Sequence, residues 1–262
     1  MQRREFLASS MIGGVGAIMA MSELSQAVEG AGGPKQLLEL RRYQIASPEK
    51  RDRLEKFFAE VAIPVWNSLG IQPVGVFRYL GEEDPSLFVL LPHNSAETVI
   101  REMAALLADP KAQSVGKDVL YDPFDDPTYQ RVESSLLLAF DGVPKVQVPT
   151  TAESRVFQLR IYESHNLTKH VKKVEMFNTG GELEIFYRCK MNPVFFGQAL
   201  IGSRLPNLTY MLGFDNEAAQ KEAWAAFLKD PQWLELRDKP EYAQTVSNIT
   251  NIVLRPSPVS QI

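Results

Sequence analysis

The sequence predicts an α+β fold in which two tandem ferredoxin-like βαββαβ units form an intrachain dimeric α/β barrel. Three observations support this prediction. A set of landmarks recurs at a nearly constant spacing, each copy alternates strand-like and helix-like patterns, and each copy alone would leave one face of its sheet uncovered. Two such faces in one chain can cover each other, which closes the two sheets into a barrel.

An internal repeat divides the chain. Leu40-Arg41-Arg42-Tyr43 recurs as Leu159-Arg160-Ile161-Tyr162, and Asp109-Pro110 recurs as Asp230-Pro231 at almost the same separation. Landmarks that recur in order indicate two copies of one unit rather than chance similarity. We therefore predict a first ferredoxin-like domain, a linker rich in Pro and Val, and a second ferredoxin-like domain, at residues 36–143, 144–152 and 153–258.

In the first copy, alternation of period two predicts an opening strand at 37–45, and Ser47 followed by Pro48 predicts the start of a helix. The apolar stripe of this helix runs to Leu69, and Pro64 should kink or restart it. The remaining elements are two strands of a hairpin, a helix that ends at an Asp-Pro capping a further turn, and a closing strand, at 74–80, 87–91, 96–107 and 136–138.

The second copy shows the same order of elements. A strand at 156–162 precedes a helix that Asn166 caps, that buries a stripe including Val171 and Phe177, and that ends at Gly180. The later elements are two strands of a hairpin, a helix followed by a turn capped at Asp-Pro, and a final strand, at 193–201, 208–214, 216–228 and 249–254.

Residues 1–27 are typical of an export signal rather than of a folded domain. Arg3-Arg4 precedes Phe6-Leu7 and an uncharged run, an arrangement that resembles the twin-arginine motif of bacterial proteins exported already folded. Ala27 fits a cleavage site, with 28–35 as a flexible leader. The alternative is a retained membrane anchor, although the run is shorter than the roughly 20 apolar residues that a span needs. We expect a periplasmic or otherwise exported protein that meets the membrane only during export.

Composition excludes several classes of function. The 28 Lys and Arg against 32 Asp and Glu leave no basic excess for a phosphate backbone, so nucleic acid is not an expected partner. The single cysteine, Cys189, excludes an internal disulfide framework and is expected to pack as a small hydrophobe. His93, His165 and His170 lack the spacing of metal ligands and fit exposed polar positions, so neither a metal site nor a cofactor is predicted.

The opening strand of each copy supplies the candidate ligand-binding residues. Successive side chains of a strand point to opposite faces, and we assign the apolar positions to the helices and the intervening positions to the space between the sheets. That space would hold two Arg-x-Tyr pairs related by a pseudo-twofold axis, with a carboxylate beside the first pair: Glu39, Arg41, Tyr43, Arg160 and Tyr162.

These residues allow two interpretations. Arg offers a bidentate fork and Tyr a hydroxyl donor, which suits a pocket for a carboxylate or an enolate. Alternatively, Glu39 and backbone carbonyls pair the arginines, and the side chains hold the two sheets in register. We favour the structural interpretation, because duplicated groups suit a symmetric structural role better than the differing roles that catalysis requires.

The second copy resembles the NIPSNAP domain family, and the opening strand of the first copy resembles the same family's opening strand. The residues that carry the resemblance are Gly197, 201–212, Phe214, Ala223-Trp224, 230–233 and, in the first copy, 39–43. The resemblance covers residues 36–258, with Ala112 standing where the second copy has Trp233. It implies a dimeric α/β-barrel fold and, for eukaryotic members, an association with mitochondria and vesicle trafficking. It implies no settled reaction and no catalytic residues.

We therefore expect an exported NIPSNAP-like protein that binds a small ligand or a protein partner through the cavity between the sheets, with homo-oligomerisation left open. The alternative is an enzyme, a cofactor-free or haem-dependent oxygenase that uses the same cavity. Antibiotic-biosynthesis-type monooxygenases and haem-degrading proteins share the fold class, which is an analogy of fold alone. No catalytic residue is predicted.

Overall fold

The computed structural model describes residues 34–81 and 83–262. The expected export signal at 1–27 and most of the expected leader lie outside the described residues. Within the described ranges, no helix combines the length and the apolar character that crossing a membrane requires.

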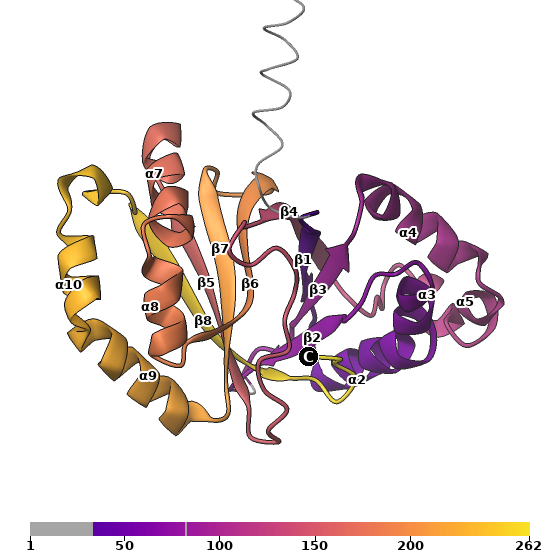
Figure 1. Ribbon diagram of the computed structural model, residues 1–262. Coiled ribbons are helices and arrows are strands. Elements are labelled where there is room, and N and C mark those ends of the chain that lie inside the picture. Colours follow the sequence, from indigo (N-terminus) through magenta and orange to yellow (C-terminus); the bar gives the residue numbers. More distant parts are fainter. Residues whose placement is uncertain (1–33, 82) are drawn as a thin grey trace, which may run out of the picture. The chain divides into compact units, whose positions relative to one another are not determined.

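Strands and helices follow one another in the order β-α-β-β-α-β twice, with successive helices counted together (Figure 1). The strands are β1 (Leu37–Gln44), β2 (Gly75–Tyr79), β3 (Leu87–His93), β4 (Arg131–Ala139), β5 (Val156–Glu163), β6 (Asn192–Ile201), β7 (Asn207–Phe214) and β8 (Asn248–Pro256). The helices are α2 (Pro48–Phe57), π-helix η1 (Phe58–Ala62), α3 (Ile63–Ser68), α4 (Ala96–Ala108), α5 (Pro110–Ser114), α6 (Lys117–Leu120), α7 (Leu167–Asn178), α8 (Glu182–Arg188), α9 (Glu217–Lys229), α10 (Pro231–Arg237) and 3-10 helix η2 (Pro240–Tyr242).

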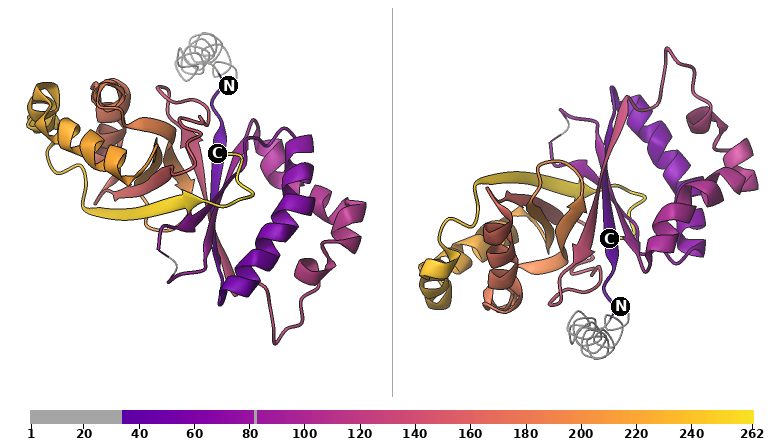
Figure 2. Two further views of the ribbon diagram at one scale, coloured as in Figure 1. Left: turned by 90° about the horizontal axis from the view of Figure 1, so that it is seen from below. Right: turned by 90° about the horizontal axis from the view of Figure 1, so that it is seen from above.

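All the strands join one closed antiparallel barrel in the order β1-β3-β2-β8-β5-β7-β6-β4. Strands β1–β4 form one half-sheet and β5–β8 the other, and the halves meet at the β2–β8 and β4–β6 pairings. Figure 2 shows helices α2–α5 outside the first half-sheet and α7–α10 outside the second, on opposite sides of the barrel. The predicted α+β fold with an intrachain dimeric α/β barrel is confirmed.

Local capping explains where the helices begin. Ser47 accepts a hydrogen bond from Lys50 N, and Asn166 accepts one from Lys169 N, as the sequence predicts. Asp109 and Asp230 cap α5 and α10 in the same way, each followed by a proline in the first helical turn. The predicted break at Pro64 takes the form of a π-helical turn, η1, directly before α3.

Three apolar cores hold the structure together. One core lies between the first half-sheet and its helices, and a second lies between the second half-sheet and its helices. The third fills the barrel and brings side chains from both half-sheets together, including Leu38, Phe77, Phe157 and Met211. The rings of Phe77 and Phe157 meet edge to face with centroids 4.9 Å apart.

The predicted assignment of strand faces is wrong in both halves. Leu38 and Leu40 of β1 and Phe157 and Leu159 of β5 belong to the barrel core, not to the helix side. The intervening residues of each strand face the helices instead. The physical reason is that alternation separates two faces without saying which one is outside, and an aromatic residue such as Tyr162 packs well beneath helices.

Other sequence predictions need smaller corrections. Val171, expected in the buried stripe of α7, is 59% exposed, and Lys173 is buried there. His93 and His170 are buried rather than exposed. Cys189 is a buried free thiol, as expected, and burial raises its pKa.

Candidate functional site

A pocket of about 390 Å³ lies between the second half-sheet and its helices. Residues of β5, helices α7 to α10, η2 and the start of β8 line it. Its polar side chains are Arg160, Tyr162, Lys173, Glu182, Arg237, Tyr242, Gln244 and Thr245, and its apolar side chains are Met176, Phe186, Trp224, Phe227, Leu228, Trp233, Val246 and Ile249. Below, we call this the Arg160 pocket.

The Arg160 guanidinium is held by aromatic rings. Its central carbon lies 4.6 Å from the ring centroid of Trp224 and 5.2 Å from that of Tyr162. Among the described residues, no carboxylate lies within ion-pair distance of this guanidinium, and its buried Nε has no hydrogen-bond partner. A half-buried guanidinium without a carboxylate partner is the kind of group that an incoming anion stabilises.

Gln158 fixes the ring that lies over Arg160. Its Oε1 accepts a hydrogen bond of 2.5 Å from Trp224 Nε1, and its Nε2 donates one of 2.7 Å to Asn251. Because both ends of this buried amide are engaged, the indole of Trp224 has a defined orientation. The stacking platform for the guanidinium is therefore built before any ligand arrives.

Two tyrosines supply a further donor to the same pocket. The Tyr210 hydroxyl donates to the Tyr162 hydroxyl at 2.9 Å, which leaves the Tyr162 proton for another acceptor. Burial raises the pKa of both phenols, and that of Tyr210 lies well above its usual value. Both groups therefore stay protonated near neutral pH, and Tyr162 is available to donate beside Arg160.

Lys173 and Glu182 form a buried ion pair with an N–O distance of 2.6 Å. The Lys173 ammonium also lies 4.3 Å from the ring centroid of Phe177. Burial raises the pKa of Glu182, while the charge of Lys173 acts in the opposite direction. The charge of Arg160 acts on the pKa of Glu182 in the same direction as Lys173, but among the described residues the only ion pair of Glu182 is with Lys173.

The corresponding arginine of the first half has different surroundings. Arg41 binds Glu39 through Nε and Nη2 at 2.7 and 2.8 Å, and it binds Glu102 at 2.5 Å. Trp66 Nε1 donates to the other Glu102 oxygen at 2.9 Å, and Ser134 donates to Glu39 at 2.6 Å. The carboxylates of Glu39 and Glu102 both neutralise the charge of Arg41, so Arg41 has a structural role.

The structure thus separates the sequence candidates into two clusters. Glu39, Arg41 and Tyr43 lie under the first set of helices, and Arg160 and Tyr162 lie under the second. The predicted pairing of Glu39 with an arginine is present, but the two Arg-x-Tyr pairs do not share a cavity. Sequence reasoning missed Lys173 and Glu182, although a lysine at the helical spacing of Phe177 was a detectable signal of a buried charge.

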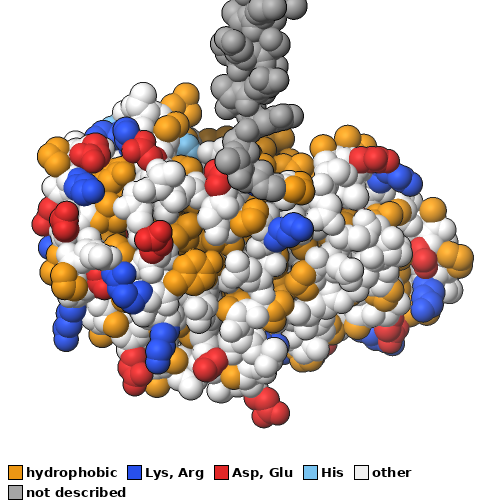
Figure 3. Space-filling model, viewed as in Figure 1, with side chains coloured by type: hydrophobic (Ala, Val, Ile, Leu, Met, Phe, Trp, Pro, Cys, Tyr) orange, Lys and Arg blue, Asp and Glu red, His pale blue; other side chains and the backbone are white. Residues whose placement is uncertain are grey.

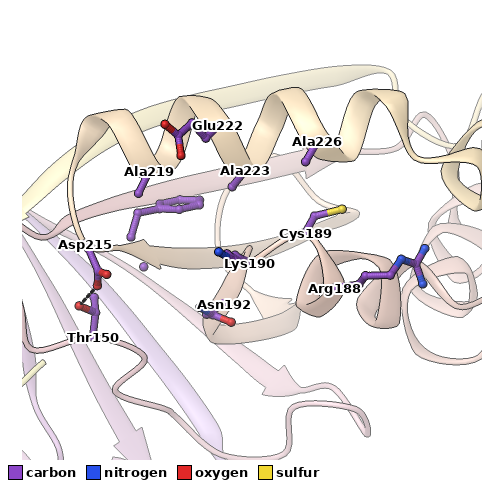
Figure 4. A pocket seen from close by; sticks show the side chains of 12 residues that line it. Thr150, Arg188, Cys189, Lys190, Asn192, Asp215, Ala219, Glu222, Ala223 and Ala226 are labelled. Atoms are coloured by element: carbon purple, nitrogen blue, oxygen red, sulfur yellow. Dashed lines mark hydrogen bonds between the residues drawn. The ribbon is translucent and has the colours of Figure 1, made fainter.

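A second pocket of about 400 Å³ lies beside the start of α9 (Figure 4). Ala219, Ala223 and Ala226 of α9 line one side of it. Two of its charged residues are bonded, because Arg188 binds Asp230 and Thr150 donates to Asp215, and its other two, Lys190 and Glu222, are exposed. This pocket therefore presents charges to solvent, whereas the Arg160 pocket holds a half-buried guanidinium between aromatic rings.

Neither the surface charge in Figure 3 nor a metal-ligand cluster indicates a further site among the described residues. On the face in Figure 3, acidic and basic side chains are interspersed, and neither sign gathers in one area. Within the part of the chain that the structure describes, no group of three or more His, Cys, Asp and Glu side chains could hold a metal ion.

The closed barrel with helices on its outer faces defines the chain as a protein of the dimeric α/β-barrel class. A proposed monooxygenase from Lactobacillus acidophilus has the same fold, with a TM-score of 0.57, 11% identity, and coverage of 85% of this chain and 94% of that chain. A proposed monooxygenase from Fusobacterium nucleatum matches with a TM-score of 0.56 and 4% identity, over 85% of this chain and 92% of that one. At these identities the likeness concerns the fold alone.

Residues 157–261 match the NIPSNAP family, and this part of the chain is a NIPSNAP domain. A NIPSNAP-like domain protein from Burkholderia xenovorans aligns with 19% identity and a TM-score of 0.38, over 42% of this chain and 90% of that one. Comparison with curated protein sequences gives no match. The NIPSNAP domain contains Arg160, Tyr162 and the helices that cover them.

Proposed function

We propose that the Arg160 pocket binds a small anionic molecule with an aromatic or apolar body, such as an aryl carboxylate or an enolate. The observation that carries this proposal is the guanidinium of Arg160, which stacks on two rings and has no carboxylate partner among the described residues. The sequence predicts a binding site between the two sheets, whereas the site we propose lies between the second half-sheet and its helices.

The donors and the walls of the pocket fit such a ligand. A carboxylate or enolate oxygen at Arg160 would receive a charge-assisted hydrogen bond from the guanidinium and a second hydrogen bond from Tyr162. Trp224, Phe186 and Trp233 would bury the apolar body. Together these groups supply orientation and apolar contact, the combination typical of a small-molecule site.

Titration with 2-naphthoate tests the proposal. We expect Arg160→Met to weaken binding by about 10- to 100-fold, because a charge-assisted hydrogen bond contributes about 1.5–3 kcal/mol. The matched control is Arg101→Met on α4, where the arginine is 65% exposed and lies outside the pocket. Isothermal titration should give wild-type affinity for the control. Equal affinity of wild type and Arg160→Met would contradict the proposed site.

A second candidate function is cofactor-free oxygenation of an enolisable substrate. The same donors that hold a carboxylate would stabilise an enolate oxygen, and an electron-rich enolate can react with dioxygen. The proposed monooxygenases that share the fold make this candidate worth testing. A haem-dependent version fits less well, because no His or Cys lines the pocket and the Lys173 amine is bound to Glu182.

Oxygen uptake separates binding from catalysis. A set of enolisable aryl ketones, including 2-tetralone, should be tested with wild type and with Arg160→Met. Uptake by the wild type that the variant loses would support the oxygenase. If no ketone gives uptake above the uncatalysed rate while 2-naphthoate still binds, the protein is a binding protein for this class of molecule.

We also propose that residues 1–27 act as a twin-arginine signal and that the folded protein is exported. The support is the Arg3-Arg4 pair followed by a short uncharged run. The double variant Arg3→Lys, Arg4→Lys should retain the precursor in the cytoplasm, which cell fractionation and immunoblotting would detect. Normal export of this variant would exclude the twin-arginine route.

The order of elements supports one further proposal about the chain's organisation. We propose that residues 36–143 are a divergent copy of the NIPSNAP unit. Both halves show the order β-α-β-β-α-β, and Asp109 and Asp230 cap corresponding short helices. In this proposal, only the second copy keeps an arginine whose charge is free for a ligand.

A further inference from the structure

We propose that one mouth of the barrel is a second binding site, for an uncharged and mainly apolar molecule that carries one carbonyl oxygen. This site differs from the Arg160 pocket in position, because it lies between the half-sheets rather than beneath helices. It is a cavity of about 370 Å³ at the end of the barrel where β1 and β5 end.

The cavity has an apolar floor and a polar rim. Leu40, Phe88, Leu159 and Ile252 form the floor, and all four pack in or against the core that fills the barrel. The wall carries the hydroxyl groups of Ser135, Thr209 and Thr250, and the rim carries the guanidinium groups of Arg42 and Arg204. Seven strands contribute lining residues, so the site belongs to the closed barrel as a whole.

A tightly held loop between β6 and β7 forms one wall. The buried Asn207 amide donates to the carbonyl oxygens of Ser203 and Arg204 at 3.0 and 3.2 Å. Gly202 lies so close to β4 that a Cβ there would approach Ser135 Oγ to 2.5 Å. These residues belong to the run 201–212, which carries the family resemblance and which the Arg160 pocket mostly leaves unused.

The loop places Arg204 at the rim in an unusual backbone conformation. Its φ of 59° lies in the left-handed region, which costs a non-glycine residue free energy unless the surroundings fix it. Its Nη1 donates to Thr250 Oγ1 on β8 at 2.9 Å, across the mouth from the loop. The amide contacts and this hydrogen bond fix the strained conformation and hold the Arg204 side chain at the rim of the cavity.

Charge determines the class of ligand. Arg42 lies 3.2 Å from Asp84 and 3.9 Å from Glu133, and Arg204 lies 3.9 Å from Glu163. With carboxylates already beside both arginines, the rim does not require an anion, in contrast to Arg160. Arg42 Nε, however, is buried without an acceptor. A neutral carbonyl oxygen would satisfy such a donor without bringing a further negative charge among three carboxylates.

The test uses 2-acetylnaphthalene as the probe and 2-ethylnaphthalene as its analogue without a carbonyl, with binding followed by ligand-observed NMR. The reference protein and its variants for these two probes carry Arg160→Met, because the Arg160 pocket is itself proposed to take aryl ketones. Thr250→Phe should fill the mouth and weaken binding of 2-acetylnaphthalene at least tenfold. The matched control is Thr168→Phe, which places the same side chain on the exposed side of α7. Circular dichroism checks that both variants fold, and Ile161→Trp at the same mouth replaces Thr250→Phe if that variant does not.

A second variant tests the role of the carbonyl. Arg42→Met should weaken 2-acetylnaphthalene and leave 2-ethylnaphthalene unchanged. The proposal is overturned if the folded mouth-filling variant binds 2-acetylnaphthalene like the reference protein, or if the ketone binds no better than the hydrocarbon. Binding of 2-naphthoate should persist in Thr250→Phe, because the Arg160 pocket does not include Thr250. The two sites can therefore fail independently.

Discussion

Arg41 of β1 and Arg160 of β5 occupy matching positions in the two halves, but their neighbours differ. Arg41 has two carboxylate partners, Glu39 and Glu102, whereas Arg160 has two aromatic rings and no carboxylate among the described residues. At the position of Glu39, β5 carries Gln158, an amide that holds Trp224 instead of a cation. These contacts fit a stabilising role for Arg41 and the proposed ligand-binding role for Arg160.

This difference predicts opposite effects of the same substitution. Arg41→Met leaves two buried carboxylates without their cation and should lower the free energy of unfolding by about 3–5 kcal/mol. Arg160→Met removes a cation–π contact but also a desolvated charge, so its effect should stay within about 1 kcal/mol. Urea unfolding measures both. Equal destabilisation of the two variants would mean that Arg160 has a structural partner.

Glu39 predicts how stability depends on pH. Burial alone would raise the pKa of its carboxyl, but contacts with His93, Arg41 and Ser134 lower it to about 2. A lowered pKa in the folded state stabilises the protein above the unfolded value of 4.5, and this contribution is lost as pH falls toward 2. At 1.36 kcal/mol per pKa unit, the loss is roughly 3 kcal/mol.

Glu39→Gln provides the comparison for this pH effect. The variant should be less stable than wild type at pH 7, and the difference should shrink as pH falls from 5 to 3. Urea unfolding at each pH gives the two curves. If the difference between them is the same at pH 3 as at pH 7, the titration of Glu39 is not its cause.

Among the elements, α7 supplies the buried lysine of the Arg160 pocket. It carries Lys173 and Met176 into the pocket, and it starts at the side-chain cap of Asn166. Asn166→Ala should cost about 1 kcal/mol of stability, because the first turn loses its side-chain acceptor. Asn166→Ser, which keeps an acceptor, should restore most of it in thermal unfolding. If Asn166→Ala melts at the wild-type temperature, the cap does not control this helix.

The long elements of the fold could be predicted from the sequence, but the shortest could not. Strands such as 156–162 have a clear alternation, and helices such as 216–228 have a cap and a defined end. The short helices α6 and α8 were missed, because α8 begins directly after Gly180-Gly181, where a stop signal dominates the local pattern. Which face of a strand lies inside was also beyond the pattern, since both faces of β5 carry large side chains.

The candidate site, too, could be predicted only in part from the sequence. Arg160 and Tyr162 could be singled out because they recur as a pair on a strand. Their partners could not, because Trp224 on α9 and Glu182 on α8 meet them only through packing between elements distant in the sequence. The charge state of the site depends on those partners, so the difference between Arg41 and Arg160 required the structure.

For the whole molecule, the shared barrel core makes each half depend on the other. Side chains of both half-sheets interdigitate there, as Phe77 and Phe157 show. Fragments 34–146 and 147–262 would each expose a wide apolar sheet face, so neither should be a stable monomer. Mixed, they should form a one-to-one complex in light scattering. A monomeric fragment with native circular dichroism would show that a half-sheet folds alone.

The joining of both half-sheets in one polypeptide has a consequence for how the protein responds to dilution. A barrel assembled from two separate chains gains stability with protein concentration, by mass action, and identical chains must present every side chain twice. Here the second half-sheet is always present at the same effective concentration, and the halves are free to differ. That freedom lets carboxylates neutralise Arg41 while Arg160 lies against aromatic rings, as the proposed ligand site requires.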